Sequence, residues 1–216
     1  MIFDPLSWLL YLPGILIGIT VHEYFHALAA DRAGDPTPAY AGRLTLNPLA
    51  HLDWLGFLLL LFAGFGWARP VPVNPLNFQG DRRLQMALVS LAGPTANLLV
   101  AFTGLLIYHL SFPTASAAVY GSGVQMLWAL IRINIVLAVF NLIPLPPLDG
   151  SKILAAFLPP AAERSFWELE RYSTLILVLL IFSGFAGRIL RPAVSFVSLW
   201  LEVGAAAIAH LVLGVL

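Results

Sequence analysis

Long apolar runs separated by short polar segments set the pattern of this chain. A helix needs about 20 consecutive apolar residues to cross a bilayer. Four runs reach or approach that length: 7–30, 84–110, 125–142 and 192–216. A fifth run, 172–187, is shorter, and we expect it to span with its flanking residues. The pattern predicts an all-α polytopic membrane protein with about five to six transmembrane helices.

The placement of basic residues predicts how these helices are oriented. Cytoplasmic loops carry an excess of Lys and Arg. Segment 112–124 has no charged residue, so we expect it on the outer side. Arg188 and Arg191 are exceptions, because the same topology places these two basic residues on the outer side. The segments that carry the excess, and that we expect in the cytoplasm, are 31–50, 68–83 and 150–171.

A sixth apolar run, 54–67, is too short to cross comfortably. The first helix ends, and the helix over 84–110 begins, on the side that we predict to be cytoplasmic, so residues 52–80 make no net crossing. We expect a re-entrant short helix followed by a β-hairpin through 66–78. Non-helical backbone at that depth is tolerated only where protein buries it or where it lines a watery cavity.

Composition agrees with a membrane protein and excludes several kinds of site. The chain has 216 residues, of which 60% are hydrophobic and 10% charged, against about a quarter charged in soluble domains. Eleven basic residues balance eleven acidic ones, so nothing indicates a nucleic-acid partner, and the absence of cysteine excludes thiolate metal sites. We expect one membrane-embedded domain over 1–216, with a catalytic core at about 8–160 and C-terminal helices at about 170–216.

Candidate chemistry begins with the sequence HEYFH near the end of the first apolar run. His22 and His26 are four residues apart, so a helix projects them from one face, one turn apart. Two neutral imidazoles placed in this way can occupy adjacent corners of a tetrahedral zinc site. Glu23 lies beside the first ligand, where its carboxylate can take a proton from water activated by the metal. The motif predicts a zinc-dependent hydrolase.

A plainer interpretation of HEYFH stays open. The three ionisable residues could be ordinary polar groups at the cytoplasmic end of the helix, because Asp31 and Arg32 follow soon after. However, ionisable residues inside a membrane cost about 2.5–3.5 kcal/mol on insertion scales and usually serve a function. We therefore favour the zinc site.

Zinc needs a further protein ligand, with one position left for water. The best candidate is Asp149 in the sequence NLIPLPPLDG, where three prolines end the preceding helix. Both motif-bearing helices are predicted to run from outside to inside, which puts Asp149 at a depth similar to that of His22 and His26. The alternative is that Asp149 only caps a helix starting at Ser151. An incomplete zinc site at the same depth favours coordination.

These motifs together resemble the site-2 protease family of intramembrane zinc metalloproteases, peptidase family M50. The segments 42–48 (GRLTLNP) and 92–97 (AGPTAN) are also similar to its compact members, and no segment indicates the PDZ or CBS domain that others carry. The resemblance covers roughly residues 8–160. It implies that Asp149 is the third zinc ligand, that Glu23 is the catalytic base and that Asn141 lies near the scissile peptide.

Two asparagines lie within apolar runs, where each needs a hydrogen-bond partner. Asn97 and Asn141 could bond across helices, which is common and worth about 0.6 kcal/mol each. They could instead bind the substrate backbone or stabilise an oxyanion. We favour the substrate role for Asn141, and for Asn97, also a candidate, both interpretations stay open. Nearby, Gly93 and Pro94 are expected to permit close helix packing or a kink.

The segment GWARPVPVNP at 66–75 alternates prolines with valines. Proline confines a strand to a sheet edge, and proteases can bind an extended substrate by adding it to such an edge. We therefore expect Val71 and Val73 to help align the substrate, although a plain surface loop is an equal alternative.

The predicted function is zinc-dependent intramembrane proteolysis, with one Zn²⁺ per chain and transmembrane proteins as substrates. A membrane metal-ion transporter or channel using the same buried ligands is the alternative. We expect an integral protein of a prokaryotic plasma membrane with its active site toward the cytoplasmic side.

Overall fold

The described part of the chain is helical throughout. A computed structural model describes residues 5–63, 66–112, 121–159, 162–163, 166, 168 and 170–214. Within these ranges there are α-helices, two short 3-10 helices and one isolated β-bridge, Leu52 to Ala68, but no strand. The all-α prediction is therefore confirmed. The α-helices are α1 (Pro5–Arg32), α2 (Thr37–Tyr40), α3 (Trp54–Ala63), α4 (Arg82–Ser111), α5 (Ser122–Asn141), α6 (Asp149–Phe157), α8 (Glu170–Phe182) and α9 (Phe185–Leu213).

Three described helices are long and apolar enough to cross a membrane. They are Arg82–Ser111, Ser122–Asn141 and Gly187–Leu213. Large apolar side chains lie exposed on them, including Leu99, Val136 and Trp200, as expected of surfaces that face lipid. Length, composition and exposure agree with a membrane protein.

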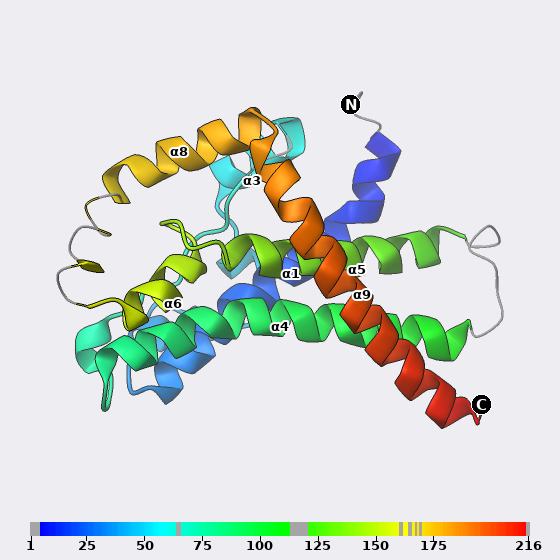
Figure 1. Ribbon diagram of the computed structural model, residues 1–216, viewed down its shortest axis with the longest axis horizontal. Coiled ribbons are helices and arrows are strands. Elements are labelled where there is room, and N and C mark those ends of the chain that lie inside the picture. The colour runs from blue at the N-terminus through cyan, green and yellow to red at the C-terminus, as the bar shows by residue number, and fades with distance from the viewer. Residues whose placement is uncertain are drawn as a thin grey trace.

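The centre of the molecule is a bundle of α1, α4 and α5, which pack against one another in every pair. In Figure 1, α4 and α5 lie side by side, and α9 crosses both diagonally. Between α4, α5 and α9 is an apolar core of buried residues. That core comprises Ala101, Leu105, Ile131, Ile135, Val139 and Ala205.

Two glycines let α1 approach α5 closely. A Cβ on Gly14 would lie 2.9 Å from the Leu130 Cα, and one on Gly18 would lie 2.8 Å from a Leu137 methyl. Glycines four residues apart are a common means of bringing membrane helices together. This packing brings the backbone of α1 within reach of polar groups on the neighbouring helices.

The boundaries differ from the sequence prediction mainly near the C-terminal end. Helix α9 extends the predicted apolar run 192–216 at its N-terminal end, because the helix begins at Phe185 and contains Pro192. The break between α8 and α9 falls at Gly184, whose φ of 72° is a conformation that glycine adopts readily. Proline inside a long membrane helix is tolerated when neighbouring groups satisfy the freed carbonyl.

Residues 52–80 contain the predicted short helix, α3, followed by an extended segment. The isolated bridge between Leu52 and Ala68 joins the segment before α3 to the segment after it. The described residues in this region form no β-hairpin ladder beyond that bridge.

Candidate metal centre

Three buried side chains from two distant parts of the chain converge at one point. His22 and His26 lie one turn apart on α1, and Asp149 is the first residue of α6. The two Nε2 atoms lie 2.9 Å apart, and Asp149 Oδ2 lies 3.2 Å from His22 Nε2 and 3.1 Å from His26 Nε2. Each residue is about 7% exposed. The three sequence-predicted ligands therefore do meet, across 127 residues of sequence.

Hydrogen bonds on the far side of each imidazole fix which nitrogen carries the hydrogen. His26 Nδ1 lies 2.7 Å from the Val89 carbonyl, which can only accept. His22 Nδ1 lies 2.7 Å from Asn97 Oδ1. Both Nδ1 atoms therefore donate, and in the neutral rings both Nε2 atoms present lone pairs.

The lone pairs make this cluster suited to binding a cation. Two unprotonated Nε2 atoms and a carboxylate oxygen face one another with no hydrogen between them, an arrangement that a bound cation stabilises. In a tetrahedral zinc site the donors lie about 2.0–2.2 Å from the ion and so about 3.3–3.5 Å from one another. The observed separations of 2.9–3.2 Å are close to that spacing. Two imidazoles and one carboxylate are also a usual donor set for zinc.

Asp149 is held in place from both ends of α6. The backbone packs so tightly at Gly150 that a Cβ there would lie 2.3 Å from the Leu142 carbonyl oxygen. At the other end, Arg83 of α4 donates to the carbonyls of Ala155 and Leu158. Helix α6 starts at Asp149 itself, with Leu148 as its N-cap, and among the described residues no backbone N–H of α6 donates to the Asp149 carboxylate. The capping-only alternative thus finds no support.

Gly93 of α4 leaves the space that the imidazoles occupy. A Cβ on Gly93 would lie 2.4 Å from His26 Nε2 and 2.8 Å from His22 Cε1. Both distances are shorter than any ordinary carbon contact, so a larger residue would displace the rings. The close packing expected at Gly93 is confirmed, and the groups packed against it are the imidazoles of the two candidate ligands on α1.

Glu23 lies beside this cluster without belonging to it. Its side chain is about 9% exposed, and its Oε2 accepts a hydrogen bond of 3.2 Å from the Val71 amide. Its charge also interacts with the buried guanidinium of Arg43. A carboxylate next to the candidate ligands but outside their donor set is suited to proton transfer.

The segment around Val71 is anchored on its N-terminal side by Arg43 and His51. The Arg69 amide donates to the His51 carbonyl at 2.9 Å. The fully buried His51 ring contacts the Thr45 carbonyl at 2.7 Å. Arg43 donates to the carbonyls of Ala50 and Arg69.

Asp35 anchors the C-terminal side of the same segment. Its carboxylate is fully buried and accepts from the Asn74 amide at 2.7 Å, from Asn77 Nδ2 at 2.8 Å and from the hydroxyl and amide of Thr37. Burial alone would raise the pKa of Asp35, but these hydrogen bonds outweigh it and hold the pKa below its usual range. Val73 packs into a small apolar cluster beneath, so residues 69–74 lie fixed beside Glu23.

The two predicted asparagines take different positions. Asn97 is fully buried, and its amide is directed at His22. Asn141 is only partly buried, and its Nδ2 donates to the Leu137 carbonyl one turn earlier in the same helix. Its Oδ1 has no hydrogen bond from the described residues, so this oxygen is available to another group.

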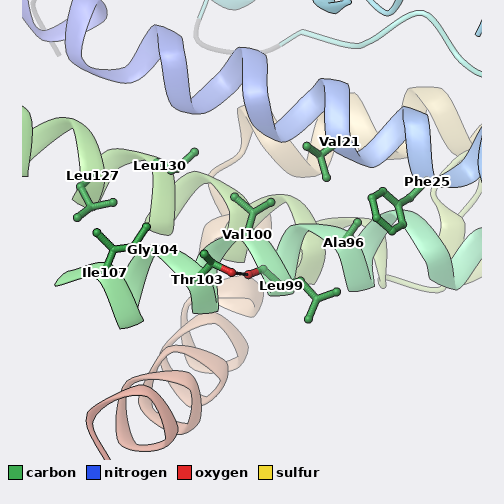
Figure 2. A pocket seen from close by; sticks show the side chains of 10 residues that line it. All are labelled: Val21, Phe25, Ala96, Leu99, Val100, Thr103, Gly104, Ile107, Leu127 and Leu130. Carbon is green, nitrogen blue, oxygen red and sulfur yellow. Dashed lines mark hydrogen bonds between the residues drawn. The ribbon is translucent and has the colours of Figure 1, made fainter. Parts of the chain in front are cut away.

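An apolar cavity of about 260 Å³ lies elsewhere, between α1, α4 and α5. Figure 2 shows its lining side chains, which come from all three helices and include none of the predicted ligands. Its one hydroxyl, on Thr103, donates to the Leu99 carbonyl at 2.8 Å. With no polar group free to act on a peptide, this cavity is not the catalytic site.

Sequence reasoning missed several residues that shape the site. Asn134, Arg43 and Asp35 are all buried polar groups next to it. Asn134 could have been found from its position, because it is a polar residue in the middle of an apolar run. Arg43 and Asp35 stand in short polar segments, where nothing in a single sequence separates a buried charge from a solvated one.

Comparison with known proteins identifies relatives of this chain. Residues 105–184 match the model of peptidase family M50. The chain is 40% identical over 195 residues to the protein named "Putative zinc metalloprotease YwhC" of Bacillus subtilis, covering 88% of this chain and 89% of that one. It is 35% identical to Rip2 of Mycolicibacterium smegmatis, which has the same descriptive name, over 82% of this chain and 70% of that one.

A more distant relative with this descriptive name, MJ0611 of Methanocaldococcus jannaschii, is 27% identical over 70% of this chain and 72% of its own length. No solved structure matches the chain significantly. The relatives' names and the donor set of His22, His26 and Asp149 agree on zinc as the metal. The chain is a zinc metalloprotease and belongs to peptidase family M50.

Proposed function

We propose that this metalloprotease is of the site-2 type and hydrolyses peptide bonds in or near transmembrane segments of membrane proteins. The observation that carries the proposal is the convergence of His22, His26 and Asp149 inside the helical bundle, with Glu23 beside them. Each of these residues is buried, and the elements that carry them pack against α4, a helix of membrane-spanning type. A protease site so placed meets substrate segments that soluble proteases do not reach.

In this proposal His22, His26 and Asp149 are the zinc ligands and Glu23 is the general base. When bound, zinc supplies a Lewis acid that polarises the scissile carbonyl and makes water acidic enough to lose a proton near neutral pH. Glu23 accepts that proton through its carboxylate and then delivers it to the leaving amine. The Val71 amide holds one oxygen of Glu23, which leaves the other for the proton.

The segment 69–74 is proposed to align the substrate as an extended strand. Pro70 and Pro72 are exposed, whereas Val71 and Val73 are half-buried. Along an extended chain the backbone polar groups alternate in direction. The edge opposite Glu23 therefore carries the carbonyls of Pro70 and Pro72, and neither of these prolines has an N–H group. A substrate strand added there donates its own N–H groups, with Val71 and Val73 setting the register.

Asn141 is proposed to contact the substrate near the scissile bond. Its Oδ1 has no partner among the described residues, and it stands one short proline-rich turn before Asp149. A free amide oxygen there can accept a hydrogen bond from a substrate backbone N–H.

The arrangement in the membrane completes the proposal. We propose one domain over 1–216, with a catalytic core at about 8–160, five to six spans and residues 52–80 re-entering the membrane from the cytoplasmic side. Support comes from α3, which is only 10 residues long, and from its flanks being joined by the Leu52–Ala68 bridge. The active site then faces the cytoplasm of a prokaryotic cell.

Cleavage of a transmembrane test peptide by the purified protein in proteoliposomes tests the function. The native chain should cleave the peptide, and Glu23→Gln should retain zinc but slow cleavage by about 10²–10⁴-fold, the usual contribution of a general base. Zinc flux into the same vesicles, unaffected by Glu23→Gln and without any cleavage, would instead support transport and overturn the proposal.

A further inference from the structure

A chain of buried side-chain amides leads from α5 to the metal-binding face of α1. Asn134 Nδ2 donates to the Leu130 carbonyl at 2.8 Å, and Asn134 Oδ1 accepts from Asn97 Nδ2 at 2.8 Å. The same Asn97 nitrogen donates to the Gly18 carbonyl at 2.9 Å. Asn97 Oδ1 then meets His22 Nδ1 at 2.7 Å. The two asparagines link α5 and α4 to the histidine on α1.

Backbone carbonyls fix the direction of every bond in this chain. The Leu130 carbonyl can only accept, so the nitrogen of Asn134 must face it and the oxygen of Asn134 must face Asn97. That oxygen and the Gly18 carbonyl take both hydrogens of the Asn97 amide. The Asn97 oxygen is left to face His22, and His22 must donate to it.

We propose that Asn134, acting through Asn97, is a positioning residue that holds His22 in the tautomer and orientation that bind zinc. The inference rests on the proposed role of His22 as a ligand. It gives Asn97 a structural partner within the protein in place of the substrate. Outer groups of this kind set the ring orientation of ligating histidines, and their loss typically weakens metal binding 10–100-fold.

The pair Asn134 and Asn97, which we call the relay, is needed for His22 and not for His26. His26 donates directly to the Val89 carbonyl, a backbone group that helix α4 itself holds in place. No backbone carbonyl contacts Nδ1 of His22 among the described residues, so a side chain takes that role. An asparagine side chain can rotate and exchange its oxygen for its nitrogen. Asn134 prevents this, because a rotated Asn97 would direct its oxygen at two acceptors.

Burial supports a role beyond packing. Asn97 and Asn134 are both fully inaccessible, and every polar atom of the two side chains has a partner. Ser90, also buried and on the same helix as Asn97, has no partner for its hydroxyl among the described residues. Ser90 therefore provides a matched control for the loss of a buried polar group.

The test measures zinc affinity by chelator competition on purified full-length protein, together with the absorption spectrum of the Co²⁺-substituted form. Asn97→Leu and Asn134→Leu should each weaken zinc binding about 10–100-fold and alter the Co²⁺ spectrum. The double variant should be no weaker than Asn97→Leu, since Asn134 acts through Asn97. Asn134→Ala gives a second measurement if Asn134→Leu folds poorly. Ser90→Ala should bind zinc normally.

Normal zinc affinity and an unchanged Co²⁺ spectrum in folded Asn134→Leu or Asn134→Ala would overturn the inference, and so would fully additive losses in the double variant. His22→Ala separates this failure from that of the proposed function. If His22→Ala loses zinc while the Asn134 variants do not, only the relay is wrong. If His22→Ala also keeps normal zinc, the ligand assignment is wrong and the relay with it.

Discussion

Gly93 lies directly against His26, with no room between them for a side chain. A Cβ on Gly93 would lie 2.4 Å from Nε2, the atom that faces Asp149. Helix α4 therefore contributes to the site in two ways: Gly93 leaves room for the imidazoles, and Asn97 forms a hydrogen bond with His22. The sequence AGPTAN combines both contributions, since Gly93 and Asn97 are four residues apart and project from one face of α4.

Gly93→Ala should weaken zinc binding. The added methyl must displace one or both imidazoles, and overpacking of this kind costs about 1–3 kcal/mol. We expect at least a tenfold loss of zinc affinity by chelator competition. Gly123→Ala is the control, because a Cβ at Gly123 meets no atom of the described residues within 4 Å. Undiminished zinc affinity in Gly93→Ala would mean that the rings do not lie against α4.

Asp35→Ala should free the segment 69–74 without removing zinc. Hydrogen bonds to a charged group contribute about 1.5–3 kcal/mol each, so amide exchange in this segment should speed up at least tenfold, as measured by mass spectrometry. Cleavage should fall while zinc content stays normal. Asp31→Ala is the matched control, since the Asp31 side chain has no partner among the described residues. Unchanged exchange would show that Asp35 does not anchor the segment.

The same contact predicts a pH dependence. Because the folded pKa of Asp35 lies below the unfolded value of about 3.9, its stabilisation is complete above the unfolded pKa and is lost as the pH falls through the folded value. Exchange of residues 69–74 should therefore be insensitive to Asp35 ionisation between pH 7 and pH 5, after correction for the intrinsic rate. Loosening of the segment should appear only below about pH 4. A loosening centred near pH 6 would contradict this.

Val71→Pro should reduce cleavage and leave zinc in place. Proline removes the amide that donates to Glu23 at 3.2 Å, so the carboxylate loses its support. We expect a fall of at least tenfold in kcat, measured on a transmembrane peptide. Val71→Ala keeps the amide and should lose much less. Equal activity in the native chain and Val71→Pro would show that the Val71 amide does not support Glu23 in catalysis.

Local pattern was enough to locate the helices that carry the chemistry. The predicted runs 84–110 and 125–142 match α4 and α5 within three residues at each end, because apolar helices of this length have few alternatives in a membrane. The candidate ligands, which do converge, followed from the spacing of the two histidines on α1 and from the aspartate after three prolines. Both features lie within a few residues of sequence, and each contains side chains that can bind a metal.

Long-range contacts could not be predicted in this way. Asn97 and His22 are 75 residues apart, and Asn97 and Asn134 are 37 apart. Nothing in a single sequence distinguishes an asparagine that supports a ligand from one that binds substrate, because both are buried amides in an apolar helix. The anchoring of residues 69–74 by Asp35 and Arg43 likewise depends on where loops meet in space.

Zinc content of purified Asp149→Ala tests the central claim most directly. The native protein should hold one zinc ion per chain by elemental analysis, and Asp149→Ala should hold nearly none, because two imidazoles alone bind zinc weakly. Asp53→Ala, which removes a carboxylate bonded instead to the Gly56 amide, should keep its zinc. A full zinc ion in folded Asp149→Ala would contradict the claim that this carboxylate and the two histidines form the metal centre.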